Sequence, residues 1–107
     1  MTTFDRREDG FEKKYAHDEE VQFRAVARRN KRLAAWAAEK LGKPASEADA
    51  YFKEVMAADL TEAGDDDVIG KIVADFKAGG VEQSEHQIRR TMDELLAAAL
   101  AEIKSGR

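Results

Sequence analysis

Apolar residues recur at steps of three and four along most of the chain, and this spacing predicts amphipathic helices. The longest such pattern covers residues 21–41, with Trp36 at the edge of a stripe that predicts the buried face. That stripe consists of Phe23, Val26, Ala27, Asn30, Leu33, Ala34, Ala37 and Leu41. Gly42 and Pro44 predict the end of this helix, because glycine favours the left-handed conformation that closes a helix and proline cannot continue one.

Two shorter helices are predicted next. The first begins near Ser46, whose side chain can cap the free N–H groups of a first turn, and it ends at Gly64. The second follows three aspartates at residues 65–67, whose negative charge suits the N-terminal end of a helix dipole. This helix ends at the glycine pair of residues 79–80.

A fourth helix is predicted to begin at Ser84, where Gln87 completes a capping box. Its apolar face consists of Ile88, Met92, Leu95, Leu96, Ala99 and Ile103. No segment shows the strict alternation of apolar and polar residues that is typical of a half-buried strand. Four amphipathic helices joined by short loops predict an all-α fold, a four-helix bundle over residues 21–107.

Residues 1–20 form a different kind of segment. They are rich in charge, and their only large apolar side chains are Phe4, Phe11 and Tyr15. Because so few apolar groups cannot offset the entropy of ordering, we expect a mobile N-terminal arm. Spacings of seven and four place the three aromatic residues on one helical stripe, about a quarter turn from the stripe of residues 21–41. Such a stripe suits a partner groove. The alternative is a frayed tail whose aromatic residues touch the surface of the bundle.

Composition narrows the class of protein. The chain contains no cysteine, which excludes disulfides and favours a reducing compartment. No apolar run is long enough to span a membrane, and the N-terminus lacks the core of a signal peptide, so we expect a cytoplasmic protein without direct membrane insertion. The net charge is −4, yet residues 21–43 carry seven basic residues against Glu39 alone. The chain therefore places a basic helix between two acidic segments, where acidic neighbours are expected to offset most of its charge.

The residues that enzymes and metal sites need are scarce. His17 and His86 are the only histidines, and no zinc-binding or phosphate-binding motif occurs. The three aspartates at residues 65–67 lead directly into a helix, whereas a calcium loop alternates its ligands and ends on a glutamate. We therefore expect no catalysis, no metal and no cofactor.

Two kinds of binding protein remain. A small helical module could bind nucleic acid, or another protein complex, through the basic face of its first helix. That face consists of Arg24, Arg28, Arg29, Lys31 and Arg32. The acidic segments on both sides would repel the phosphates of nucleic acid, whereas the aromatic stripe of the arm has no evident use within the bundle. We therefore expect a protein partner and no nucleic acid.

Several segments resemble one known family. They are FEKKYAHDEEVQFRAVARRNKRLAAWAAEKLG, GDDDV and SEHQIRRTMDELL, in this order along nearly the whole chain. Together they resemble the zeta subunit of alphaproteobacterial F-type ATP synthases. The resemblance implies a four-helix bundle whose mobile arm inhibits ATP hydrolysis. It implies that the arm becomes helical between the catalytic alpha and beta subunits and reaches the rotating gamma subunit. The protein would be cytoplasmic, peripheral on the inner face of the plasma membrane.

The same resemblance implies that residues 1–19 form the inhibitory segment. Its partner-binding residues would be Phe4, Arg7, Glu8, Phe11, Tyr15 and His17. One departure from a good inserting helix is Gly10, because glycine costs about 1 kcal/mol in a helix interior. The implied mechanism is a steric block of a catalytic interface and of the rotor, without chemistry by the inhibitor itself.

Overall fold

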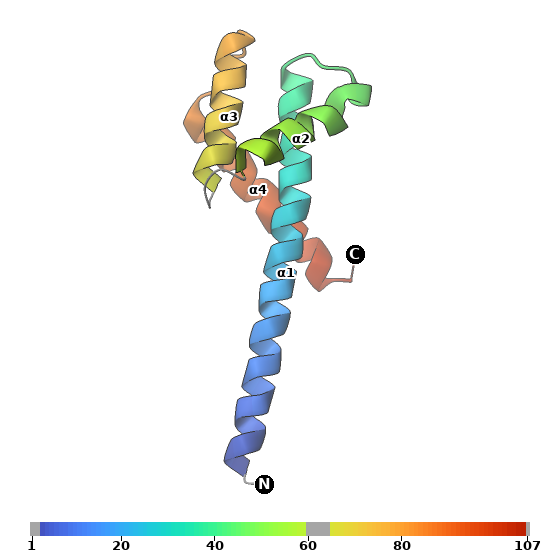
Figure 1. Cartoon of the computed structure of the whole chain (residues 1–107), viewed down its shortest axis with the longest axis vertical. Coiled ribbons are helices and arrows are strands. Elements are labelled where there is room, and N and C mark those ends of the chain that lie inside the picture. The colour runs from blue at the N-terminus through green and yellow to red at the C-terminus, as the bar shows by residue number, and fades with distance from the viewer. Residues whose placement is uncertain (1–2, 60–64, 107) are drawn as a thin grey trace.

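A computed structural model describes the backbone of residues 3–59 and 65–106, and the side chains of residues 17–58 and 65–106. Its elements are α1 (Thr3–Lys40), a 3-10 turn η1 (Ala45–Glu47), α2 (Ala48–Asp59), α3 (Asp65–Ala78) and α4 (Glu85–Lys104). Every regular element in the described part of the chain is helical (Figure 1), which confirms the all-α prediction.

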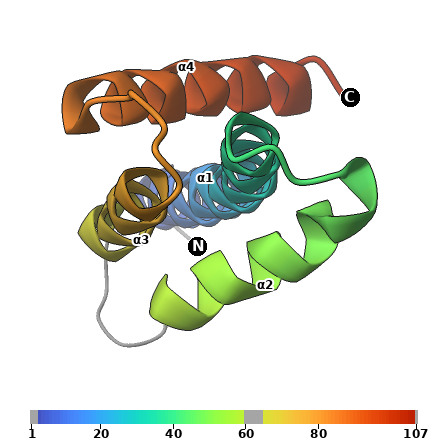
Figure 2. The ribbon, with the colours of Figure 1, turned by 90° about the horizontal axis from the view of Figure 1, so that it is seen from above.

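The three shorter helices gather around the C-terminal half of α1 (Figure 2), and the N-terminal half extends away from them (Figure 1). At 1.5 Å per residue, the 38 residues of α1 measure about 57 Å. This helix therefore accounts for most of the longest dimension of a molecule that measures 64 × 28 × 24 Å. The N-terminal part of α1, residues 3–20, therefore projects from the bundle as a helical shaft (Figure 1).

Helix α1 begins at Thr3, well before the range of residues 21–41 that its apolar pattern predicted. The added turns contain several glutamate, lysine, arginine and alanine residues, which favour a helix without packing, and no proline interrupts them. The apolar pattern reports which residues are buried against other helices, so it could not locate the start of this segment.

Glycine ends two of the helices as predicted. Gly42 adopts a φ of +78° after α1, and Gly80 adopts a φ of +71° after α3. Behind Gly42, the Lys43 N–H donates to the Ala38 carbonyl at 2.9 Å, which is the wrapping hydrogen bond of a Schellman motif. These turns reverse the chain within a few residues and allow neighbouring helices to pack.

The N-cap predictions have mixed outcomes. Ser84 and Gln87 form the expected capping box at the start of α4, with hydrogen bonds of 3.1 and 2.8 Å. The prediction for Ser46 was wrong, because this residue lies inside the 3-10 turn that follows Pro44. The proline fixes an extended entry into that turn, so the chain begins to coil one residue before Ser46. The predicted end of this helix at Gly64 lies outside the described residues.

Two apolar clusters hold the helices together. The main cluster joins all four helices around Leu33, Ala34, Ala37, Ala38, Tyr51, Val55, Val68, Ile69, Ile72, Phe76, Ile88 and Met92. A smaller cluster joins the middle of α1 to the C-terminal half of α4 through Val21, Ala25, Ala99 and Ile103. The predicted apolar face of α4 is confirmed, because its four most buried members are Ile88, Met92, Ala99 and Ile103. Helix α4 therefore contacts α1 at positions closer to the N-terminus of α1 than the main cluster does.

The predicted buried stripe of α1 was wrong at Phe23 and Ala27. Both are exposed, and Phe23 leaves 76% of its surface uncovered. At about 100° per residue, Phe23 lies nearly opposite Val21 and Ala25, which face α4. The side of α1 that faces α2 and α3 becomes buried only farther along, from Arg29 and Asn30 onwards. Phe23 therefore lies on the side of α1 that faces α2 and α3, but it lies closer to the N-terminus than these two helices reach.

Trp36 is partly buried against the main cluster, as the sequence predicted, and its ring meets Phe76 edge-on with centroids 5.6 Å apart. Trp36→Ala should destabilise the fold by about 3 kcal/mol, because it removes a large contact that small neighbours cannot replace. Urea denaturation measures this loss. An unfolding midpoint equal to that of the wild type would show that the indole contributes little to the core.

Candidate functional site

The shaft of α1 leaves the bundle at Val21, which is the first described side chain that another helix covers. The four side chains before it, from His17 to Glu20, are all exposed. Beyond this point the backbone continues as a single helix to Thr3 without a neighbouring helix (Figure 1). This geometry leaves the N-terminal part of α1 open to a partner on every side.

The six predicted partner-binding positions all belong to the backbone of α1. The side chains of Phe4, Arg7, Glu8, Phe11 and Tyr15 lie outside the described residues, although their backbone belongs to α1. His17 is described, and its side chain is exposed. The structure therefore places all six positions on one helix, and their contacts stay a prediction.

An ion-pair cluster fixes α4 against α1 on the bundle side of Val21. Arg32 forms a bidentate pair with Glu102 at 2.6 and 2.7 Å, and Arg28 reaches the same carboxylate at 3.1 Å. Hydrogen bonds from Arg32 hold the pKa of Glu102 at about 2, below its ordinary 4.5. The cluster joins residues about 70 positions apart in sequence and fixes the middle of α1 to the C-terminal half of α4.

The ion pairs of Glu102 with Arg28 and Arg32 form a clamp between α1 and α4, and a fall in pH should weaken this clamp. A carboxyl group whose pKa is lower in the folded state stabilises the fold above its unfolded pKa, and this contribution is lost as the pH falls towards the folded pKa. Glu102→Gln should therefore lower stability at pH 7, and its difference from the wild type should vanish between about pH 4.5 and pH 2. Urea denaturation across this range measures the effect. The exposed pair of Arg90 and Glu94 offers a control, because Glu94→Gln should change little at any pH.

Arg29 is the most unusual side chain of the helix, because only 2% of it is exposed. Its guanidinium donates to the Asn30 side-chain oxygen at 2.8 and 3.1 Å and to the Asp65 carboxylate at 2.7 and 3.2 Å. Asp65 lies in the first turn of α3 and is half exposed. The sequence placed Arg29 on the basic face of its helix, whereas the structure buries it as a link between α1 and α3.

These ion pairs reduce the number of unpaired positive charges on the basic face of α1. Of its five members, Arg28, Arg29 and Arg32 each contact a carboxylate, and Arg24 and Lys31 are exposed. The expectation that acidic neighbours offset the charge of this helix is confirmed for the three paired residues. The face that remains is too small to follow several phosphates, which weakens the case for nucleic-acid binding.

A second polar network lies between α2 and α3 at the far end of the bundle. The Tyr51 hydroxyl donates to Asp75 at 2.8 Å, and Lys71 pairs with Asp75 at 3.0 Å. Burial and the hydrogen bond to Asp75 raise the pKa of Tyr51 above its ordinary value. A shallow cavity of about 160 Å³ opens beside them, lined by Leu41, Lys43, Tyr51, Glu54 and Asp75. These contacts satisfy one another and join the two helices.

The described ranges contain neither a metal-binding cluster nor a helix that could span a membrane. No three histidine, cysteine, aspartate or glutamate side chains there are placed to hold a metal ion. Two of the first-turn aspartates of α3 instead pair with arginines, Asp65 with Arg29 at 2.7 Å and Asp66 with Arg89 at 2.9 Å. None of the described helical stretches has the length and apolar character that crossing a membrane requires.

Comparison with models of protein families gives a match over nearly the whole chain. Residues 1–102 fit the model of a family described as ATPase inhibitor subunit zeta, and the match therefore includes α1 and nearly all of the bundle. A search of the curated proteins found no match.

Proposed function

Since the chain belongs to the ATPase inhibitor subunit zeta family, we propose that residues 1–20 act as an inhibitory arm on an F-type ATP synthase. In this proposal the arm inserts as a helix between catalytic alpha and beta subunits, near the gamma rotor. The bundle of residues 21–107 stays outside and carries the arm. The protein is not an enzyme, and it acts at the inner face of the plasma membrane through its partner.

The observation that carries this proposal is the direction of α1. The helix passes its last supporting contacts at Val21 and Ala25 and then continues alone for about 27 Å, at 1.5 Å per residue, to Thr3. A projecting helix of this length can enter a groove of another protein while the bundle remains at the rim. The clamp of Arg28, Arg32 and Glu102 on α4 fixes the direction in which the arm projects.

The mechanism needs no reactive group in this chain. A catalytic interface of a rotary ATPase must open and close during each cycle, and a helix held inside it prevents closure. Phe4, Phe11 and Tyr15 would supply the desolvated contacts that hold the helix there, and Arg7 and Glu8 would pair with charges on the groove walls. The match of the family model to residues 1–102 includes this segment.

ATP hydrolysis by the isolated catalytic head of an F-type ATP synthase tests the proposal. Hydrolysis should fall to a low plateau as the full chain is added, and inhibition should depend only weakly on salt because apolar contacts hold the arm. No inhibition at saturating amounts would contradict it. If the chain instead bound nucleic acid with an affinity that falls steeply with salt, the basic face would become the functional site.

A further inference from the structure

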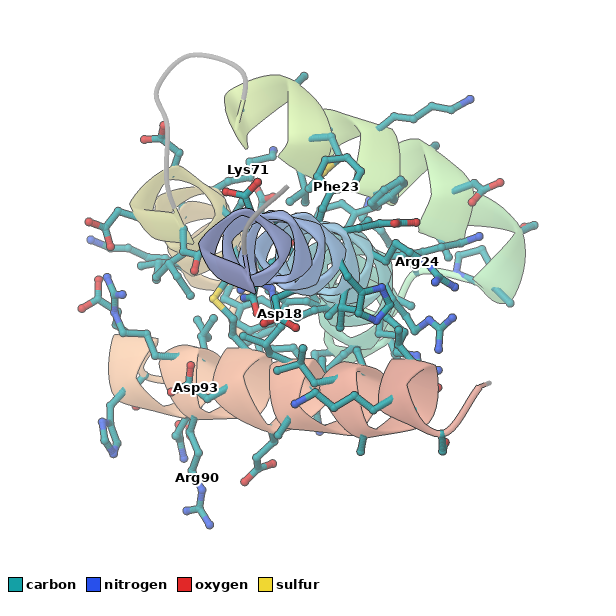
Figure 3. The ribbon with its side chains drawn as sticks, turned by 90° about the horizontal axis from the view of Figure 1, so that it is seen from below. Asp18, Phe23, Arg24, Lys71, Arg90 and Asp93 are labelled. Atoms are coloured by element: carbon teal, nitrogen blue, oxygen red, sulfur yellow. The ribbon has the colours of Figure 1, made fainter. Side chains whose placement is uncertain are left out.

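Phe23 is the only large apolar residue among the described side chains that is exposed, with 76% of its surface uncovered. Viewed along α1, it points to the side away from α4, whereas Asp18 and Arg24 point in other directions (Figure 3). An aromatic ring of this kind buries about 150–250 Å² when a partner covers it. Its exposure in the isolated chain therefore leaves a substantial apolar contact unused.

The helix around Phe23 is held in place by its opposite side. Val21 and Ala25 pack on Ala99 and Ile103 of α4, and the pairs of Arg28 with Glu102 lie a little farther along. Because the backbone is already ordered, a partner that covers Phe23 pays little additional entropy. Rigid, exposed aromatic residues on such a support are typical of binding hot spots.

We propose that Phe23 is a second anchor for the ATPase head, outside the arm, on the rim of the groove that the arm enters. This inference rests on the proposed function and names a further contact for the same partner. Phe23 lies only four positions after Glu19, the end of the inhibitory segment, which is about 6 Å along a helix. Since α1 is continuous here, a protein that surrounds residues 1–19 brings its outer edge to the level of Phe23.

The charges around Phe23 indicate which kind of partner surface would be complementary to it. Exposed Glu19 and Glu20 lie one turn before it, exposed Arg24 lies next to it, and exposed Lys31 lies two turns after it. The complementary surface is an apolar pocket with a basic group on the side of the arm and an acidic group on the side of the bundle. A second copy of the chain is a poorer occupant, because a stable dimer buries about 800 Å² per partner and one ring supplies only a fraction of this.

The affinity of the full-length chain for the isolated ATPase head tests the inference. Phe23→Ala should weaken binding at least tenfold, and Phe23→Leu should recover part of the loss because it keeps an apolar side chain. Gln22→Ala is the matched control, since Gln22 is the preceding exposed residue on the same turn, and its affinity should stay within twofold of the wild type. All three variants should unfold at the wild-type urea concentration, because neither position is buried.

The outcomes separate this inference from the arm model. If Phe23→Ala binds as the wild type does while Phe11→Ala/Tyr15→Ala is impaired, the arm model stands and the second anchor is refuted. If Phe23→Ala is impaired while the arm variant inhibits normally, the anchor stands and the arm model fails. A wild-type chain that is dimeric in sedimentation analysis, and becomes monomeric in Phe23→Ala, would assign the ring to self-association and overturn the inference.

Discussion

Arg29→Ala should destabilise the bundle by about 3 kcal/mol, although the substitution removes a charged residue from a helix that is otherwise solvated on one side. The side chain is almost completely buried and ranks among the largest fully buried ones. Its removal leaves a cavity beside the main cluster and deprives the Asn30 side-chain oxygen of both of its donors. Half-exposed Asp65 can return to water, which limits the loss.

Urea denaturation of two further variants identifies the source of this effect. Arg29→Met keeps most of the buried stem, so it should cost clearly less than alanine if packing dominates. Arg24→Ala removes an exposed arginine from the same helix and should stay within about 0.5 kcal/mol of the wild type. An Arg29→Ala chain that unfolds at the wild-type urea concentration would show that the link between α1 and α3 is dispensable.

The second large effect concerns function. Phe11→Ala combined with Tyr15→Ala should abolish inhibition of ATP hydrolysis, because aromatic anchors provide most of the binding energy of a helix in a groove. The positions of these residues precede Val21, the first described residue of α1 that packs on α4, and lie about 80–120° around the helix from it, so they are not expected to contribute to the contacts that build the bundle. The free energy of unfolding should therefore change by no more than about 0.5 kcal/mol.

Glu12→Ala in the same arm is the control for this double variant, because its position lies off the aromatic stripe. It should keep nearly full inhibition. Equal inhibition by the wild type and the double variant would remove the aromatic stripe from the mechanism and direct attention to the helix surface around Arg28.

Local signals in the sequence were sufficient to predict much of the fold. The capping box of Ser84 and Gln87 and the glycine at residue 42 each depend on residues within a few positions, so their geometry follows from local chemistry. The apolar face of α4 was equally clear, since its 3.6-residue period is unbroken. The existence of the helices, the C-terminal ends of α1 and α3 and the all-α class could be inferred for the same reason.

Features that depend on where another helix ends could not be predicted in this way. Phe23 fits the periodicity of a buried stripe, and only the limited reach of α2 and α3 along α1 leaves it exposed. Arg29 shows the reverse case, because a charged residue is rarely buried and its partner Asp65 lies 36 positions away. The clamp on Glu102 likewise joins distant segments of the chain. The candidate arm was identified from composition and resemblance, and its backbone proved continuous with α1.

Site-directed photo-crosslinking from the arm tests the central claim most directly. The chain contains no cysteine, so Glu12→Cys accepts a single photoreactive label within the inhibitory segment, and His86→Cys places the same label at the exposed start of α4. In the inhibited complex, the label at position 12 should crosslink to alpha and beta subunits, and the label at position 86 should give far less of either product. Crosslinks from position 86 alone, with none from position 12 while hydrolysis is fully inhibited, would contradict insertion of the arm.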